Sequence, residues 1–167
     1  MGFLKWIKSL RKGPAYERNQ ERAVWSVDPL DKFLHKVGNE LGLLEVSFSG
    51  ELVQVNYFRV LFKVKVADDC FIGVTLTNGF SDGKDVLDVV MAVNEKEYPK
   101  TDETMGPPII VRLGKINSRV ELEGALNAKE NEIKSKIINA PMVADRLRAG
   151  KTKRREMRKK IMKDDEE

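Results

Sequence analysis

The stretch VLFKVKVADDCFIGVTL, residues 60–76, decides the fold. In each half of it an apolar side chain occupies every second position, and the polar pair Asp68 and Asp69 separates the halves. A period of two places these apolar side chains on one face of a β-strand, and a polar turn between two such runs predicts an antiparallel hairpin. One face of the sheet is therefore expected to be buried and the other to be polar.

The same pattern extends in both directions along the chain. Residues 44–49 and 53–57 alternate in the same way, and a turn is expected at residues 49–51. Residues 109–113 and 116–122 predict two more strands. Together these runs predict an antiparallel sheet of about five to six strands.

A helix is expected before the first strand. Asp28 is a favourable N-cap residue, Pro29 suits the first helical turn, and Gly42 is placed to end the helix. The apolar residues between them recur at the spacing of one helical face: Leu30, Phe33, Leu34, Val37 and Leu41. The preceding residues 14–25 are polar and are expected to form a linker.

Residues 82–94 leave two alternatives open. Their valines recur at helical spacing, which favours a helix, whereas the preference of valine for extended backbone favours a strand. The chain is expected to be helical after Gly124. The predicted fold class is α+β, with an antiparallel sheet, an N-terminal helix and a C-terminal helical, basic tail.

Charge divides the chain into three parts. Residues 1–23 carry six basic and two acidic groups, and residues 146–167 carry ten basic and five acidic groups. The part between them is acidic, so a net charge of +4 conceals an acidic body with two basic ends. The expected organisation is an N-terminal arm and linker at residues 1–25, a core domain at residues 26–140 and a basic tail at residues 141–167.

The N-terminal arm has the pattern of an interfacial membrane helix. Its apolar face and its basic face are formed by Phe3, Trp6, Ile7 and Leu10, and by Lys5, Lys8, Arg11 and Lys12. Tryptophan favours the headgroup zone of a bilayer, and lysines attract anionic lipid. The alternative is that the apolar face packs on the protein's own core.

The C-terminal tail has the pattern of a phosphate-binding helix. Its basic residues are Lys151, Lys153, Arg154, Arg155, Arg158, Lys159, Lys160 and Lys163. As a helix, the tail presents positive charge on almost every side, which suits contact with nucleic acid without base readout. The same charges attract anionic lipid, or serve only to keep the protein soluble.

Enzyme chemistry has little support in the sequence. A single cysteine and a single histidine exclude the usual four-ligand zinc site, and no glycine-rich nucleotide loop occurs. No cofactor and no small-molecule substrate is expected. The remaining enzyme alternative is a divalent-metal hydrolase that would use carboxylates near one strand turn, namely Asp68, Asp69, Asp82, Asp85 and Asp88.

The first 17 residues resemble the start of rhabdovirus matrix proteins. The resemblance consists of the arm MGFLKWIKSLRK (residues 1–12) and the segment GPAYE (residues 13–17). In that family a Pro-Pro-x-Tyr motif recruits WW-domain ligases, and here Pro14 and Tyr16 fit it while Gly13 replaces its first proline. The resemblance implies a matrix-like protein that assembles between a membrane and a ribonucleoprotein.

These observations favour a scaffold or interaction protein over an enzyme. We expect an intracellular protein, peripheral to a membrane, whose partners are an anionic membrane surface and RNA or a ribonucleoprotein. A nucleic-acid-binding protein with a nuclear location is the alternative, and a homo-oligomer remains open. No run of 18 apolar residues occurs, so no bilayer-spanning helix is expected.

Overall fold

The computed structural model describes residues 3–78, 85–94 and 108–164, with backbone only at residues 3–12, 94, 143, 144, 147, 151 and 164. Eight elements follow one another in these parts of the chain. In order they are α1 (Phe3–Leu41), β1 (Glu45–Val53), β2 (Phe58–Ala67), β3 (Cys70–Thr77), β4 (Val86–Asn94), β5 (Ile109–Lys115), α2 (Arg119–Ala128) and α3 (Glu130–Asp164).

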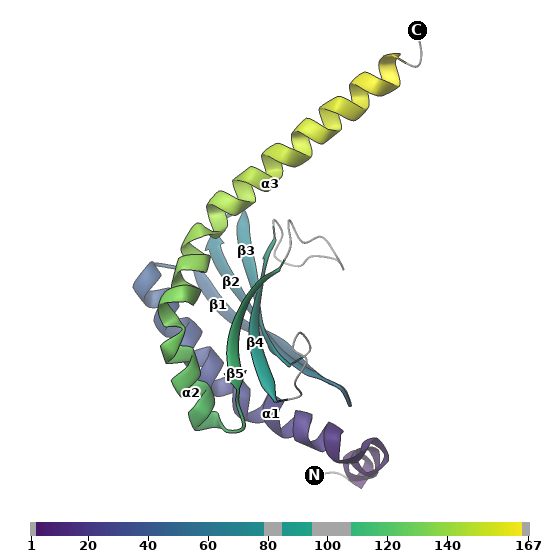
Figure 1. Ribbon diagram of the computed structural model, residues 1–167, viewed down its shortest axis with the longest axis vertical. Helices are drawn as coiled ribbons and strands as arrows, with labels where there is room; N and C mark the ends of the chain where they lie inside the picture. The colour runs from purple at the N-terminus through teal and green to yellow at the C-terminus, as the bar shows by residue number, and fades with distance from the viewer. Residues whose placement is uncertain (1–2, 79–84, 95–107, 165–167) are drawn as a thin grey trace.

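The five strands form one antiparallel sheet in the order β1-β2-β3-β4-β5. Each strand pairs with its neighbour in sequence, so the sheet is a simple meander. All three helices lie against the same face of this sheet (Figure 1). The predicted α+β class, with a helix before the sheet and helices after it, is confirmed.

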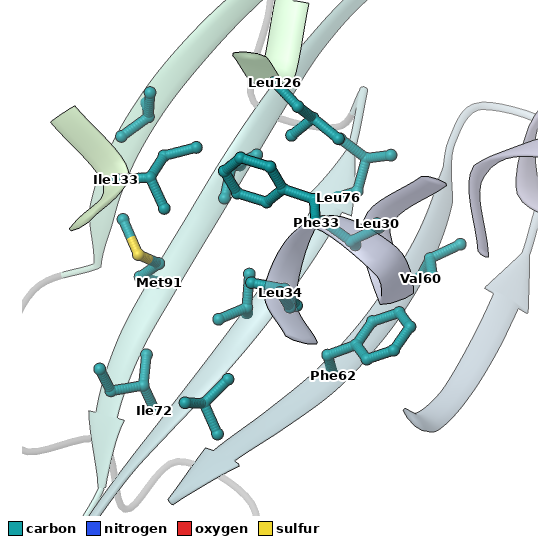
Figure 2. Close-up of a cluster of buried hydrophobic side chains, with 14 of the residues drawn as sticks. Leu30, Phe33, Leu34, Val60, Phe62, Ile72, Leu76, Met91, Leu126 and Ile133 are labelled. Carbon is teal, nitrogen blue, oxygen red and sulfur yellow. The ribbon is translucent and has the colours of Figure 1, made fainter. Parts of the chain in front are cut away.

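The alternation in residues 60–76 builds the core. Val60, Phe62 and Val64 of β2 are fully buried, whereas Arg59 and Leu61, at the alternate positions, are exposed. Side chains of α1, α2 and α3 meet this apolar face of the sheet (Figure 2). The large apolar side chains on the helical side of the core are Leu30, Phe33, Leu34, Val37, Leu122, Leu126, Ile133 and Ile137.

The turn expected at residues 49–51 is wrong. Residues 45–53 form the single strand β1, and its register with β2 shifts between Phe48 and Gly50. Gly50 has φ 149°, a conformation that glycine adopts readily, so the polar stretch is a bulge inside one strand. The chain turns later, where the amide N–H of Gln54 donates to the carbonyl of Tyr57 at 2.8 Å.

The helix favoured for residues 82–94 is also wrong where the structure describes it. Residues 86–94 form the strand β4. Val89 and Met91 face the core, while Asp88 and Val90, on the opposite face of the strand, are also buried, at 0% and 8% exposure. Both faces of β4 are therefore covered, which removes the alternation that identifies a strand.

The strand expected at residues 116–122 is wrong as well, because helix α2 begins at Arg119. Ser118 instead caps the N-terminus of α2, because its hydroxyl accepts a hydrogen bond from the amide of Glu121 at 3.2 Å. The Glu121 carboxylate accepts a hydrogen bond from the amide of Asn117 at 2.7 Å. Serine followed three residues later by glutamate is a helix-start signal, and it overrides the apparent alternation here.

Residues 14–25 are helical, not a linker. The helix continues through Asp28 and Pro29, which do not start it, and ends at Leu41 as expected before Gly42. Gly42 has φ 67°, which suits a glycine at a helix end. The segment contributes Ala23 to the core, with 0% exposure, so it belongs to the folded body.

Helices α1 and α3 are longer than the sheet that they cover. The longest strand has ten residues, which extend over about 33 Å. Helix α3 has 35 residues and is about 52 Å long. One end of α1 and one end of α3 therefore project beyond the sheet, at opposite ends of the molecule (Figure 1).

Neighbouring positions on α1 provide a test of this packing. We expect Ala23→Glu to lower the free energy of unfolding by about 3 kcal/mol or more, because it buries an unpaired carboxylate. Val24→Glu, at a position that is 67% exposed, should change it by no more than about 0.5 kcal/mol. Urea denaturation measures both, and equal effects would mean that residues 14–25 do not pack on the body.

Candidate functional site

The free end of α3 is the most prominent surface feature. The first part of the helix packs on the body through Ile133, Ile137 and Ala140, all at most 1% exposed. Between residues 152 and 163 every side chain is exposed. This segment projects away from the body as a single helix (Figure 1). Gly150, just before this segment, is helical as well. Residues 151–163 are called the α3 arm below.

Arg148 fixes the point at which the α3 arm leaves the body. Its Nη1 atom lies 2.9 Å from Oδ2 of Asp69, and its Nη2 atom donates to the Asp69 carbonyl at 2.7 Å. Asp145, one turn earlier on α3, contacts the same guanidinium at 3.3 Å. Because Asp69 lies in the turn between β2 and β3, this contact holds α3 against that end of the sheet.

The charges of the α3 arm face solvent. Its seven described basic side chains are exposed, and none of them forms an ion pair with another described residue: Lys153, Arg154, Arg155, Arg158, Lys159, Lys160 and Lys163. Lys151 is described as backbone only. The helix distributes these charges around most of its circumference. Met157 and Ile161 occupy the remaining narrow strip and are 67% and 61% exposed.

The N-terminal arm is a separate helical segment. Residues 3–12 are helical, but Gly13 has φ 78° and ψ −177°, so α1 is interrupted there. The residues predicted to contact a membrane all precede this interruption. Their side chains lie outside the described residues: Phe3, Lys5, Trp6, Ile7, Lys8, Leu10, Arg11 and Lys12. Whether the apolar face meets lipid or the protein therefore stays a prediction.

The proposed partner motif lies just after Gly13 and is helical. Pro14 is exposed and Tyr16 is half-buried in α1. Proline-rich ligands of WW domains bind in an extended polyproline conformation. The backbone at Pro14 and Tyr16 is therefore not in the form that such a domain recognises.

An arginine cluster, which the sequence analysis did not identify, lies on the same turns of α1. Arg18 and Arg22, one helical turn apart, both donate to Oδ1 of Asp85. Arg22 is 4% exposed and Arg18 is 53% exposed, while Asp85 is 36% exposed. The carbonyl of Asp85 in turn accepts the amide N–H of Ile116 at 3.0 Å. The cluster thus ties α1 to the segments that flank β4 and β5.

Two buried asparagines support this cluster. The side-chain amide of Asn19 donates to the carbonyls of Gln54 and Val55, at 2.9 Å and 3.1 Å. The Asn78 amide donates to Oδ1 of Asn19 at 3.4 Å and its own Oδ1 accepts the amide of Phe58 at 3.1 Å. These bonds hold α1 against the β1–β2 turn, and beside them lies an open cavity of about 240 Å³.

The carboxylates of the metal-site alternative contact basic side chains. Asp68 lies 3.6 Å from Lys65, and the Asp88 carboxylate lies 3.1 Å from Nε of Arg112. Asp69 and Asp85 contact the arginines named above, and Asp82 lies outside the described residues. Within the described ranges, no three His, Cys, Asp or Glu side chains gather to hold a metal ion. No helix in these ranges is long and apolar enough to cross a bilayer.

The arginine cluster predicts a pH dependence. The hydrogen bond from Arg22 lowers the pKa of the Asp85 carboxyl below its ordinary value of 3.8, and the charges of Arg18 and Lys115 act in the same direction. A lowered pKa in the folded state stabilises the fold above that ordinary value, and this contribution is lost as the pH falls through the folded pKa.

We therefore expect Asp85→Asn to lower the free energy of unfolding near neutral pH and to lose less of it on acidification than the wild type. Urea denaturation from about pH 6 to about pH 3 measures this difference. Glu45→Gln, at an exposed position on β1, is the control for charge removal alone. Parallel curves for the wild type and Asp85→Asn would contradict the assignment.

No protein-family model, no curated protein and no solved structure matches this chain. Its surfaces alone must therefore indicate its function.

Proposed function

We propose that this protein is a non-enzymatic scaffold that bridges two anionic surfaces. The α3 arm contacts the phosphates of RNA or of a ribonucleoprotein, and the N-terminal arm, residues 3–12, lies on anionic lipid. The observation that carries the proposal is the α3 arm itself, a helix with seven exposed basic side chains and no ion pair to the other described residues.

The exposure of the α3 arm supports a binding role over an internal one. The body offers acidic groups, yet among the described residues its last ion pair along α3 is the one between Asp69 and Arg148, before the α3 arm begins. An isolated cationic helix attracts polyanions because each phosphate contact releases condensed counterions. Since the charges surround most of the helix, the contact needs no particular base sequence. The arm carries no aromatic residue between positions 151 and 163, so base stacking adds nothing.

The positions of the two arms support bridging. The N-terminal arm and the α3 arm extend from opposite ends of the molecule (Figure 1). The protein can therefore contact a membrane at one end and a nucleoprotein at the other end at the same time. The residues between the arms are acidic in composition, so their negative charge repels both anionic surfaces from the body. A nucleic-acid-binding protein that uses the α3 arm alone is the second candidate, favoured by the full exposure of that arm's described basic side chains.

Salt dependence tests the α3 arm. We expect the quadruple variant Arg154→Ala, Arg155→Ala, Arg158→Ala and Lys159→Ala to bind single-stranded RNA more weakly. The slope of log affinity against log salt should become shallower by about 3, because each lost phosphate contact removes about 0.7. Fluorescence anisotropy at several salt concentrations measures the slope.

A body variant with the same loss of charge is the control for this measurement. It replaces four lysines of the body with alanine, of which three are exposed and Lys129 is half-buried: Lys32, Lys36, Lys129 and Lys136. Its slope should stay close to that of the wild type. If the two quadruple variants change the slope equally, the attraction comes from net charge and not from the α3 arm.

Partition into liposomes tests the N-terminal arm. Trp6→Glu should lower the partition into anionic vesicles by more than about tenfold, since it removes an interfacial aromatic ring and places a carboxylate on the apolar face. Ser9→Glu adds the same charge away from that face and should have a smaller effect. Cosedimentation measures both. Equal losses would show that only charge matters, and no loss would leave the α3 arm as the sole binding element.

A further inference from the structure

We propose that the cavity beside the Gly13 interruption of α1 binds a phosphate group. The cavity has a volume of about 240 Å³. It lies between α1 and the ends of β1 and β3, and its lining residues are Pro14, Ala15, Arg18, Asn19, Arg22, Val55, Asn56 and Asn78. Sites for drug-sized ligands occupy roughly 300–1,000 Å³. This cavity therefore suits a small group in place of a whole nucleotide.

The polar lining consists of hydrogen-bond donors that suit an oxyanion. Two guanidinium groups and three side-chain amides line the cavity, and no carboxylate does so among the described residues. The amides of Asn19 and Asn78 hold the wall in place through the bonds described above. Asn56 is exposed and is available to a ligand. A guanidinium fork matches the geometry of phosphate oxygens, and it binds them in pairs.

Arg18 retains donors for a ligand. Only its Nη2 atom is engaged, by Asp85 at 2.5 Å and by Asn117 at 3.5 Å. No described residue takes its Nε or Nη1 donors. At 53% exposure the side chain is accessible from solvent, while the contact with Asp85 limits its freedom. A partly fixed guanidinium loses less conformational freedom on binding than a free one.

The charge around the cavity favours an anion. Arg18 and Arg22 share a single carboxylate, and Lys115 also acts on that carboxylate. Three basic groups therefore act on this one carboxylate. A phosphate entering the cavity meets the guanidinium groups of Arg18 and Arg22, which are already in place.

The choice of phosphate over another oxyanion rests on the proposed function. Residues 3–12, proposed to lie on lipid, join the body at Gly13, and Pro14 and Ala15 line the cavity directly after it. The cavity is thus placed where a lipid headgroup would meet the body. A small soluble phosphate offers the same chemistry, so the shared recognition element is a phosphate group, and the experiment separates the two sources.

Nuclear magnetic resonance and vesicle binding together test the site. Inorganic phosphate, titrated against the full chain, should shift the amide signals of Ala15 and Asn56. Arg18→Gln and Asn56→Asp should weaken this binding by about tenfold or more, since the first removes a donor and a charge and the second adds a repelling charge. Neither change touches a buried side chain, so both variants should fold.

Two matched changes elsewhere control for charge. Arg119→Gln removes an arginine of similar exposure, 46%, and Asn127→Asp adds a carboxylate at another exposed asparagine. Both should leave phosphate binding unchanged. If they weaken it as much as Arg18→Gln and Asn56→Asp do, or if phosphate shifts none of these amide signals and Arg18→Gln binds phosphatidic acid vesicles like the wild type, the proposal is overturned.

Vesicles of phosphatidylcholine with and without phosphatidic acid identify the source of the phosphate. A headgroup site predicts that Arg18→Gln loses the preference for phosphatidic acid, whereas a soluble-phosphate site predicts that only the response to inorganic phosphate is lost. Either loss supports the cavity. Trp6→Glu separates this inference from the proposed function, because it should abolish vesicle binding and leave the response to inorganic phosphate intact.

Discussion

The fold depends on covering one apolar face of an open, five-stranded meander. Val60, Phe62 and their neighbours form that face, and it is stable only if helices exclude water from it. Helices α1, α2 and α3 all pack on this side (Figure 1). At roughly 25 cal/mol for each Å² of buried apolar surface, this contact is the dominant favourable contribution to folding. Every other feature of the molecule is positioned by it.

The same constraint explains why the protein has arms. A sheet whose longest strand extends over about 33 Å can bury only part of a helix of about 52 Å. The excess length of α3 must therefore lie in solvent, and a solvated helix without tertiary packing needs polar side chains on most of its surface. The α3 arm meets this requirement with lysine and arginine. The positive potential of the α3 arm thus has two causes: α3 is longer than the sheet, and the charged residues on its solvated part are mostly basic.

Sequence patterns predicted the elements in which one face is wet. β2 alternates between buried and exposed or half-buried positions, β3 has half-buried Gly73 and Thr75 between its core residues, and the end of α1 at Gly42 was also predicted. Sequence patterns failed where the two faces of an element do not differ in their exposure to water. In β4 both Asp88 and Val90 are buried opposite the core, so helical and extended spacings looked alike. At α2 a helix cap outweighed an alternation, and Ser118 followed by Glu121 was the signal that could have revealed it. The α3 arm was recognised because charge needs no tertiary context.

The first half of α1 was missed for a different reason, and that reason bears on function. Its buried face is largely polar: besides Ala23 it holds Asn19, Arg22 and Ser26, which are at most 4% exposed, so no apolar period marks it as part of the body. Polar burial of this kind contributes less stability than an apolar face of the same shape. If packing of the helix on the body were the only requirement, leucine at these positions would stabilise that contact more. The arginines instead line the cavity between α1 and the ends of β1 and β3, directly after the Gly13 interruption, where we propose that a phosphate group binds.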